Sequence, residues 1–300
     1  MAQHPGPVLV TGANSGFGLG TTLRLASRGW EVYGTVRSEA KAAHLADEAA
    51  REKVGDRVRP VVLDVSDHDA VKARFPELPD FYGVVNNAGY SQLGAVEEVS
   101  AAEARAQLDI NLIAPAIVSS CALPGMRRIG AGRIVMVSSV AGLASVMPLN
   151  AWYHASKFGL EALADVLRME VAGFGVKVAI VEPGFFKTGI TESARGLAED
   201  RQAEPSLYAD AYKRAVQALS AIHALAPPPS VVVRRIVSAI ESRWPSRRYV
   251  VGLDAAAGAL TSALVPRGIV DATARLLSAL PSTPRGRRDA ESGSSRSARA

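Results

Sequence analysis

The first part of the chain alternates short apolar runs with longer segments that repeat apolar residues at helical spacing. Runs rich in Val and Ile, such as residues 176–181, are typical of strands buried on both faces of a sheet. The pattern predicts strands at residues 8–11, 31–36, 58–64, 83–86, 133–137 and 176–181, and helices at about 16–27, 39–53, 101–128 and 151–173.

This strict alternation of strand and helix determines the expected architecture. Parallel strands joined by right-handed helical crossovers form a sheet with helices on both sides. We therefore expect an α/β fold: a single doubly wound, Rossmann-type parallel sheet with helices on both faces. The ligand crevice of such a sheet lies at the carboxyl ends of its strands.

The pattern changes after Pro183. Residues 184–230 are predicted to be largely irregular, with helical pieces at about 207–225. Because this segment lies between two strands of one sheet, we interpret it as a small helical insertion that covers the substrate rather than as a second domain. The predicted elements that follow are a break at 227–229, a helix at about 230–242 and a last strand at 249–251.

One domain is expected over residues 1–280, in which amphipathic pieces after Ala255 close the pocket in preference to contacting a membrane surface. Residues 281–300 are rich in Ser, Gly and Arg and are predicted to be a disordered basic tail. The net charge is +5, and this tail holds five arginines against two acidic residues, so the other 280 residues carry only +2. That near-neutral balance argues against nucleic-acid binding.

Composition indicates an ordinary soluble chain, with 300 residues, 48% hydrophobic and 21% charged. The single cysteine, Cys121, excludes an intramolecular disulfide and a cysteine-based metal site, and it is compatible with a cytoplasmic location. Its apolar surroundings indicate a packed thiol.

We expect no signal peptide and no transmembrane segment, because the longest uncharged stretch, 134–156, is interrupted by serines, Pro148 and Asn150.

The segment Tyr153-His154-Ala155-Ser156-Lys157 carries the first candidate chemistry. On a helix, Tyr153 and Lys157 lie on one face, one turn apart. A neighbouring ammonium stabilises a phenolate and lowers the pKa of the phenol from its usual value near 10. A general acid and base for an alcohol or a ketone needs this property. Taken alone, the pair could equally be a solvated pair on a helix surface.

A glycine-rich turn follows the first predicted strand, with Gly12, Gly16 and Gly18 around Asn14, Ser15 and Phe17. Glycines in this position permit a tight turn and close approach of the backbone to a pyrophosphate. The N-terminus of the following helix then faces the phosphates with free N–H groups. The turn predicts a dinucleotide site.

The end of the second strand distinguishes NADP from NAD. An acidic residue there would bind the adenosine ribose hydroxyls, but this chain has Val36 followed by Arg37. A guanidinium binds a 2′-phosphate in bidentate fashion, and Ser15 could add a hydroxyl contact, so NADP is favoured and NAD remains possible.

Two more strand ends are expected to contact the cofactor. Asp64, followed by Val65, could accept from the adenine amino group, or it could cap the next helix, as Ser66 or Asp67 could also do. The segment Asn86-Asn87-Ala88-Gly89 could tie neighbouring strand ends together beneath the cofactor, or it could be a plain turn.

With these motifs in this order, the chain resembles the short-chain dehydrogenase/reductase family from about residue 8 to 189, and more loosely to about 252. Within that family it is similar to the 17β-hydroxysteroid and retinol dehydrogenase-like members. The resemblance implies an NAD(P)-dependent enzyme that interconverts an apolar alcohol and a ketone or aldehyde. It also implies a homodimer or homotetramer formed through helices 101–128 and 151–173. The alternative is a catalytically silent dinucleotide-binding redox sensor.

The resemblance assigns roles to individual residues. Tyr153 is implied as the general acid or base, Lys157 as the group that lowers its pKa and holds the ribose, and Ser139 as the hydrogen-bonding partner of the substrate oxygen. The amide of Asn111 is implied to position a water in the proton path. Pro183, Gly184 and Thr188 are implied to lie over the nicotinamide, and Phe186 is included among the cofactor contacts. The expected apolar pocket consists of Tyr90, Leu143, Met147, Leu149, Phe185, Phe186 and Ile190.

The spacing between the serine and the tyrosine departs from the family. Thirteen residues separate Ser139 from Tyr153, where the family usually has twelve. One additional residue in the loop at 143–150 is the simplest explanation. Ser138 is the reserve candidate, although alternation along the strand would direct it to the other face.

Overall fold

The computed structural model describes residues 4–145, 147–203 and 205–280. The predicted tail at 281–300 lies outside the described residues. The strands are β1 (Val8–Val10), β2 (Val32–Val36), β3 (Val58–Val62), β4 (Gly83–Asn86), β5 (Gly132–Val137), β6 (Val176–Pro183) and β7 (Arg248–Val251). The helices are α1 (Gly16–Ser27), α2 (Glu39–Arg51), α3 (His68–Arg74), α4 (Ala101–Leu108), α5 (Ala114–Ile129), α6 (Ala151–Val171), α7 (Gly189–Ala203), α8 (Ala209–Leu225), α9 (Ser230–Glu241), α10 (Leu253–Leu264) and α11 (Arg267–Ser278).

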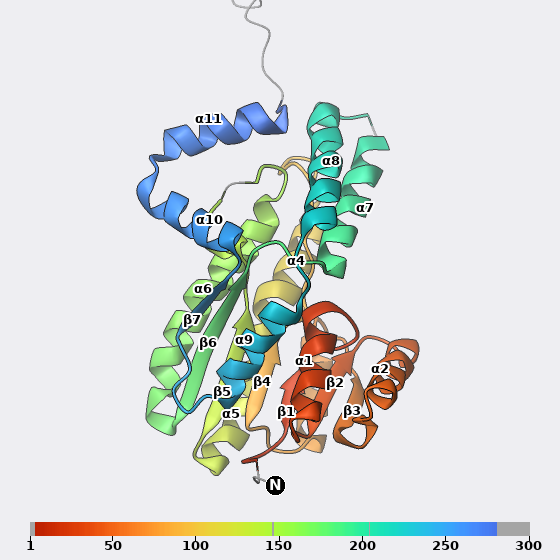
Figure 1. Ribbon diagram of the computed structural model, residues 1–300, viewed down its shortest axis with the longest axis vertical. Coiled ribbons are helices and arrows are strands. Elements are labelled where there is room, and N and C mark those ends of the chain that lie inside the picture. The colour runs from red at the N-terminus through yellow and green to blue at the C-terminus, as the bar shows by residue number, and fades with distance from the viewer. Residues whose placement is uncertain (1–3, 146, 204, 281–300) are drawn as a thin grey trace, which may run out of the picture.

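Within the described residues, the seven strands form one parallel sheet in the order β3-β2-β1-β4-β5-β6-β7 (Figure 1). The chain starts in the middle of the sheet, winds out to β3, returns to β4 and continues to β7. The predicted doubly wound fold is confirmed. The change of direction between β1 and β4 opens the crevice in which such sheets bind ligands.

Side chains that alternate along the strands build a core on each face. On β5, Val135 and Val137 join a cluster with α1, α2 and α9, whereas Ile134 and Met136 join a cluster with α3, α5 and α6. All six residues of β5 are buried, as expected for a central strand covered on both sides. The half-buried Cys121 packs against the second cluster, and burial raises the pKa of its thiol.

Besides shifts of one or two residues at several element ends, two differences from the prediction have a clear physical cause. Strand β3 stops at Val62, two residues early, because the side chain of Asp64 accepts hydrogen bonds from Ser66 N (3.0 Å) and Ser66 Oγ (2.7 Å) and turns the chain. The helix predicted at 101–128 is interrupted by one π-helical turn at Asp109–Ile113, which joins α4 to α5.

The segment after Pro183 is more regular than predicted. It contains α7, which the sequence analysis missed, and α8, which pack together around a third buried cluster that includes Leu93, Ala198 and Tyr212. The buried face of α7 consists of Thr191, Ala194 and Ala198, so it lacks the large apolar residues that mark a helix in a sequence. Figure 1 shows α7 and α8 on one side and α10 and α11 on the other, beyond the carboxyl ends of the strands.

Among the described residues, the helix at Ala101–Ile129 is long and apolar enough to cross a membrane, and the bent pair α8 and α9 passes the same test jointly. In the first helix, 44% of the relevant window is buried inside the protein. Its buried residues, such as Val118 and Met126, pack on the sheet. One such helix is weak evidence for a membrane span, because a core helix passes the same test of length and composition.

Candidate active site

The glycine turn after β1 is packed closely against the end of β4. Gly12 has a φ of 66°, and a Cβ atom on Gly18 would lie 2.1 Å from the carbonyl oxygen of Gly12. The amide of Asn87 donates to Thr11 O (2.9 Å) and Gly12 O (3.3 Å). Asn87 therefore ties the two strand ends together as predicted, whereas Asn86 turns away and donates to Ser119 Oγ (2.9 Å). The result is a turn with an open backbone surface above it.

A groove of about 800 Å³ runs from this turn along the carboxyl ends of β2 and β4. That volume is within the range of cofactor sites, about 300–1,000 Å³. The predicted cofactor contacts that line it are Gly12, Asn14, Ser15, Gly16, Phe17, Arg37, Val65, Asn87, Ala88, Gly89 and Thr188. A dinucleotide fits this site, because a glycine cradle and an open groove occur together at the N-terminus of α1.

The far end of the groove is cationic. Arg37 is exposed, and the partly buried Lys41 lines the groove beside it. Neither side chain forms an ion pair within the part of the chain that the structure describes. Lys41 was not predicted, although it follows Arg37 by four residues and is fixed in the first turn of α2, where its N–H donates to the Ser38 cap (3.4 Å).

Asp64 does not line the groove. Its carboxylate holds the turn at Ser66. Of the three residues that could cap the next helix, Asp67 does so, and it accepts a hydrogen bond from Ala70 N (2.9 Å). Val65, the next residue, does line the groove.

An apolar pocket of about 170 Å³ adjoins the groove, and the predicted catalytic side chains meet there. Ser139, Tyr153 and Lys157 all line it. Ser139 follows β5, while Tyr153 and Lys157 occupy successive turns of α6. Both residues on α6 are buried, with exposed fractions of 9% and 5%.

Tyr153 and Ser139 interact directly. A hydrogen bond from Ser139 lowers the pKa of the Tyr153 phenol, but burial raises that pKa more strongly and the net direction is upward. The expected depression by Lys157 is absent in the protein alone. The reason is geometric: the ammonium of Lys157 lies 5.7 Å from the ring centroid and donates to Val137 O (2.9 Å) at the end of β5.

The ammonium form of Lys157 is destabilised by its position. Burial lowers its pKa to about 8, and the charge of Glu161 opposes that change. A lysine with this pKa exchanges a proton near neutral pH, which an exposed lysine does not.

The two serines at the end of β5 face opposite ways. The hydroxyl of Ser139 reaches Tyr153 and accepts from Ala141 N (3.2 Å), whereas Ser138 Oγ is buried beneath Gly142 and has no hydrogen-bond partner in the described structure. Strand alternation thus favours Ser139, and the location of the additional residue in the following loop stays a prediction. In that loop Leu149 adopts a left-handed φ of 64°.

Asn111 lies in the π-helical turn and is buried. Its carbonyl oxygen accepts from Tyr90 N (3.1 Å), and its NH₂ donates to Tyr90 O (3.0 Å) and Ser156 Oγ (3.1 Å). Both amide N–H groups are therefore used within the protein. Asn111 connects the Tyr90 loop to α6, and water positioning by its side chain stays a prediction.

The pocket wall agrees in part with the predicted residues. Tyr90, Met147, Phe185, Phe186 and Ile190 line the pocket, together with Pro183, Gly184 and Thr188. The prediction that Leu143 and Leu149 line the pocket was wrong. Leu149 is 8% exposed and packs into the cluster beneath α7 and α8, and Leu143 is not part of the pocket wall.

Asp254, at the start of α10, is a site residue that the sequence analysis missed. Its carboxylate accepts from Phe185 N (2.6 Å), and it lies so close to Gly184 that a Cβ there would be 2.1 Å from Oδ2. Asp254 thus holds the loop after β6 over the pocket. Gly258, one turn later on α10, also lines the pocket, so this helix closes it as expected.

Comparisons with known proteins agree with this geometry. Residues 7–198 match the family model of the short chain dehydrogenases. The chain is 33% identical over 283 residues to human retinol dehydrogenase 16, covering 88% of this chain and 86% of that protein.

Solved structures give the same result. The structure superposes on a short-chain dehydrogenase from Streptomyces avermitilis with a TM-score of 0.74 and 28% identity, over 92% of this chain and 98% of that one. It superposes on a variant of the actinorhodin polyketide ketoreductase with NADPH with a TM-score of 0.69 and 27% identity, over 83% and 96% of the two chains. The chain belongs to the short-chain dehydrogenase/reductase family and is an NAD(P)-dependent oxidoreductase.

Proposed function

We propose that the protein interconverts an apolar alcohol and the corresponding ketone or aldehyde, with NADP(H) as the hydride carrier. The observation that carries this proposal is the meeting of Ser139, Tyr153 and Lys157 in an apolar pocket that opens onto the dinucleotide groove.

The chain supplies the proton, and a bound nicotinamide supplies or accepts the hydride. In the reducing direction, Ser139 orients the carbonyl oxygen by a hydrogen bond, and Tyr153 donates its proton to that oxygen as hydride reaches the carbonyl carbon. The resulting phenolate takes a proton from Lys157, and Lys157 then regains a proton from solvent. Burial of Tyr153 and Lys157 excludes competing water from this transfer.

NADP(H) is proposed over NAD(H) because of charge. Arg37 and Lys41 provide two cations at the end of the groove where a 2′-phosphate would lie, and Val36 occupies the position where an acidic residue would favour NAD. The related ketoreductase structure holds NADPH, which supports the same choice.

An apolar substrate is proposed because the pocket is enclosed mainly by side chains such as Met147, Phe185 and Phe186. At about 170 Å³ the pocket is smaller than most complete ligand sites, so it admits the reacting end of a long molecule rather than the whole of it. The name of the related retinol dehydrogenase supports a substrate of this class.

A homodimer or homotetramer is proposed through the outer face of α6 and its neighbour α5. The exposed apolar residues Phe158, Val166 and Met169 lie along α6, and Met169 is 72% exposed. An apolar row of this kind on a helix that the protein's own core does not cover is suited to packing against a second copy.

The test is a fluorescence titration of the full-length protein with NADPH and NADH, followed by steady-state assays with a panel of ketones and aldehydes of increasing chain length. We expect tighter binding of NADPH and a kcat/KM that rises with apolar chain length. Tight binding without turnover of any carbonyl or alcohol would contradict the proposal and would instead favour the redox-sensing alternative.

A further inference from the structure

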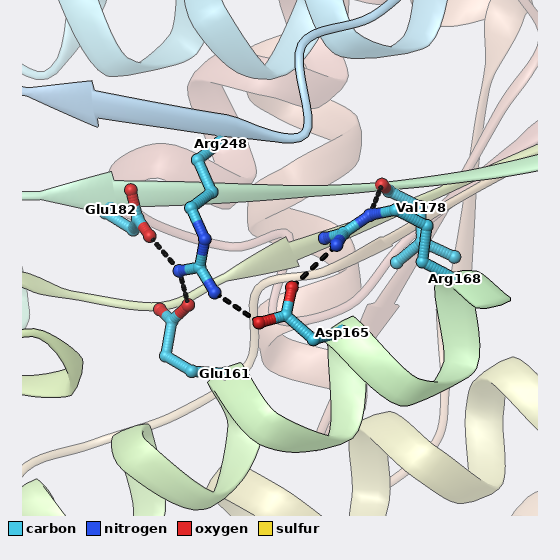
Figure 2. A network of polar contacts seen from close by, with 6 residues as sticks. All are labelled: Glu161, Asp165, Arg168, Val178, Glu182 and Arg248. Atoms are coloured by element: carbon cyan, nitrogen blue, oxygen red, sulfur yellow. Dashed lines mark hydrogen bonds and ion pairs between the residues drawn. The ribbon is translucent and has the colours of Figure 1, made fainter.

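A cluster of charged residues extends from α6 to the last strand of the sheet (Figure 2). Arg248 of β7 places Nη1 against Glu161 Oε2 and against Glu182 Oε1 (2.5 Å), and its Nη2 against Asp165 Oδ2 (2.6 Å). Arg168 joins the other oxygen of Asp165 (2.6 Å). The cluster therefore links the helix that carries Tyr153 and Lys157 to β6 and β7.

Its inner members are deeply buried. The side chains of Glu161 and Glu182 have exposed fractions of 8% and 0%, whereas Asp165 and Arg248 reach the surface. Three carboxylates share two guanidiniums, so the fully ionised cluster retains one negative charge. A buried charge of this kind requires a compensating cation or a proton.

Lys157 is a buried cation on the same helix. It lies four residues before Glu161 on α6, so the two side chains occupy the same face of the helix, one turn apart. The charge of Glu161 raises the pKa of Lys157 against the larger, opposite effect of burial.

Within the described residues, one buried oxygen on each of the two inner carboxylates lacks a hydrogen-bond donor. Glu161 Oε1 and Glu182 Oε2 are buried and have no hydrogen-bond partner in the described structure, and the same holds for Ser138 Oγ. Burial and the charge of Glu161 raise the pKa of Glu182 to about 7. Ser138 Oγ and Glu161 Cγ both lie within 3.0 Å of the place that a Cβ on Gly142 would take, which brings them together between β5 and α6.

We propose that the buried pair Glu161 and Glu182, held by Arg248, keeps the ammonium of Lys157 charged and so sets the upper limit of the pH range in which the enzyme reduces its substrate. The pair consists of positioning residues, because it acts through Lys157 and lies outside the pocket wall. As the pH rises through about 7, Glu182 loses its proton, and the cluster acquires the negative charge that retains the proton on Lys157. The inference rests on the proposed role of Lys157 in proton transfer.

Other titratable groups around Lys157 do not supply this charge. His154 on α6 is buried, burial lowers its pKa, and its Nδ1 contacts Ala141 O (2.8 Å). Asp254 from α10 accepts from Phe185 N, and Asp109 lies on the groove side. Tyr90 lines both the pocket and the groove, and burial raises the pKa of both Tyr90 and Tyr153, so both phenols are neutral before turnover. From β5, Val137 O and Ser138 face this region.

The test compares Glu161→Gln, Glu182→Gln and Asp165→Asn with the wild-type protein. Carbon-13 labelling of the lysine side chains follows the titration of Lys157, which is assigned with Lys157→Met. Steady-state carbonyl reduction is measured from pH 5.5 to 10 with saturating NADPH. In Glu161→Gln we expect the pKa of Lys157 and the alkaline limb of kcat to move down together by about one pH unit, with turnover near pH 6 within about threefold of wild type.

Glu182→Gln should also move the pKa of Lys157 and the alkaline limb of kcat down. If Glu161→Gln does not fold, Glu182→Gln alone serves as the test. Asp165→Asn is the matched control, since it changes the same cluster two turns from Lys157 at a partly exposed position, and it should shift them by less than about 0.3 units. An unchanged Lys157 titration in both glutamine variants overturns the inference. Absence of turnover in the wild-type protein would instead contradict the proposed function, and the lysine titration would still be readable.

Discussion

At the scale of single residues, the site depends on polar groups held where burial alone would not favour them. Lys157 is the clearest case, because burial lowers its pKa from 10.5 to about 8. The folded state therefore releases a proton more easily than the unfolded state. At pH values below 8 both states are protonated, and the folded state carries the full cost of the buried charge.

Lys157→Met should remove that cost together with the chemistry. The hydrogen bond to Val137 O is also lost, so we expect a net gain in the free energy of unfolding of about 1–2 kcal/mol at pH 7 and no measurable turnover. The gain should shrink as the pH rises from 8 to 10.5, because the wild-type lysine then becomes neutral in the folded state. Urea unfolding at pH 7 and pH 10 provides the measurement. A loss of stability at pH 7 would contradict the account.

The cationic end of the groove makes a separate prediction. Arg37→Ala should weaken NADPH binding by about tenfold to a hundredfold and leave NADH binding within about twofold, because only NADPH has the 2′-phosphate. Lys41→Ala should act in the same direction, and Arg24→Ala on α1 is the control for a change of charge outside the groove. Equal loss of both nucleotides in Arg37→Ala would show that Arg37 does not select the phosphate.

The sequence pattern was sufficient to predict residues whose role depends on local spacing. Tyr153 and Lys157 are one helical turn apart, and Gly12, Gly16 and Gly18 share one turn, so neither set required knowledge of distant parts of the chain. Asp254 could not be found in this way, because it meets Phe185 across 69 residues of sequence. The same holds for Arg248, which joins Glu161 and Glu182 only after β7 has paired with β6.

At the scale of elements, α10 is tied to the loop that follows β6. The contact runs from the carboxylate of Asp254 to Phe185 N, and Gly184 and Gly252 allow the close approach that it requires. A charged acceptor of this kind fixes a backbone segment more firmly than a neutral one does. The position of α10 therefore determines how Pro183, Gly184 and Phe185 face the pocket.

Asp254→Ala should leave Phe185 N without its partner and loosen this loop. We expect NADPH binding to weaken by about fivefold to tenfold and the KM for the apolar carbonyl substrate to rise. In Asp254→Asn, which keeps an acceptor oxygen, both quantities should remain within about twofold of wild type. Fluorescence titration and steady-state assays measure both effects. Identical behaviour of the alanine and asparagine variants would contradict a hydrogen-bonding role.

Strands and helices with large apolar residues were predictable, and those without them were not. Strands β5 and β6 are rich in Val and Ile and are buried on both faces, so their pattern was clear. In contrast, α7 buries only Thr191, Ala194 and Ala198, and the interruption at Asp109–Ile113 depends on tertiary contacts of Asn111. Local propensity does not encode either feature.

At the scale of the whole molecule, the sheet carries the binding machinery at one end and leaves an apolar helix face free on its side. The doubly wound topology follows from the alternation of strands and helices, which is why it could be predicted without a structure. The assembly, by contrast, was expected only from the family resemblance and stays a prediction, because it depends on which surface residues remain uncovered. Val166 and Met169 on α6 are 49% and 72% exposed.

Met169→Arg should therefore reduce the assembly to smaller species, since it places a charge in the centre of the proposed interface. Leu207→Arg is the matched control, because Leu207 is also an exposed apolar residue but lies between α7 and α8. Size-exclusion chromatography with light scattering measures both. We expect the wild type and Leu207→Arg to be dimeric or tetrameric. A wild-type protein that is monomeric at micromolar concentration would rule out the interface.

The most direct measurement of the central claim is carbonyl reduction by Tyr153→Phe, which removes one hydroxyl and keeps the ring that fills the site. We expect kcat to fall by about 10²–10⁴-fold while the dissociation constant for NADPH stays within about threefold of wild type, because the phenol acts on the proton and not on binding of the nucleotide. Turnover comparable to that of the wild type, on the same carbonyl substrate, would contradict the account.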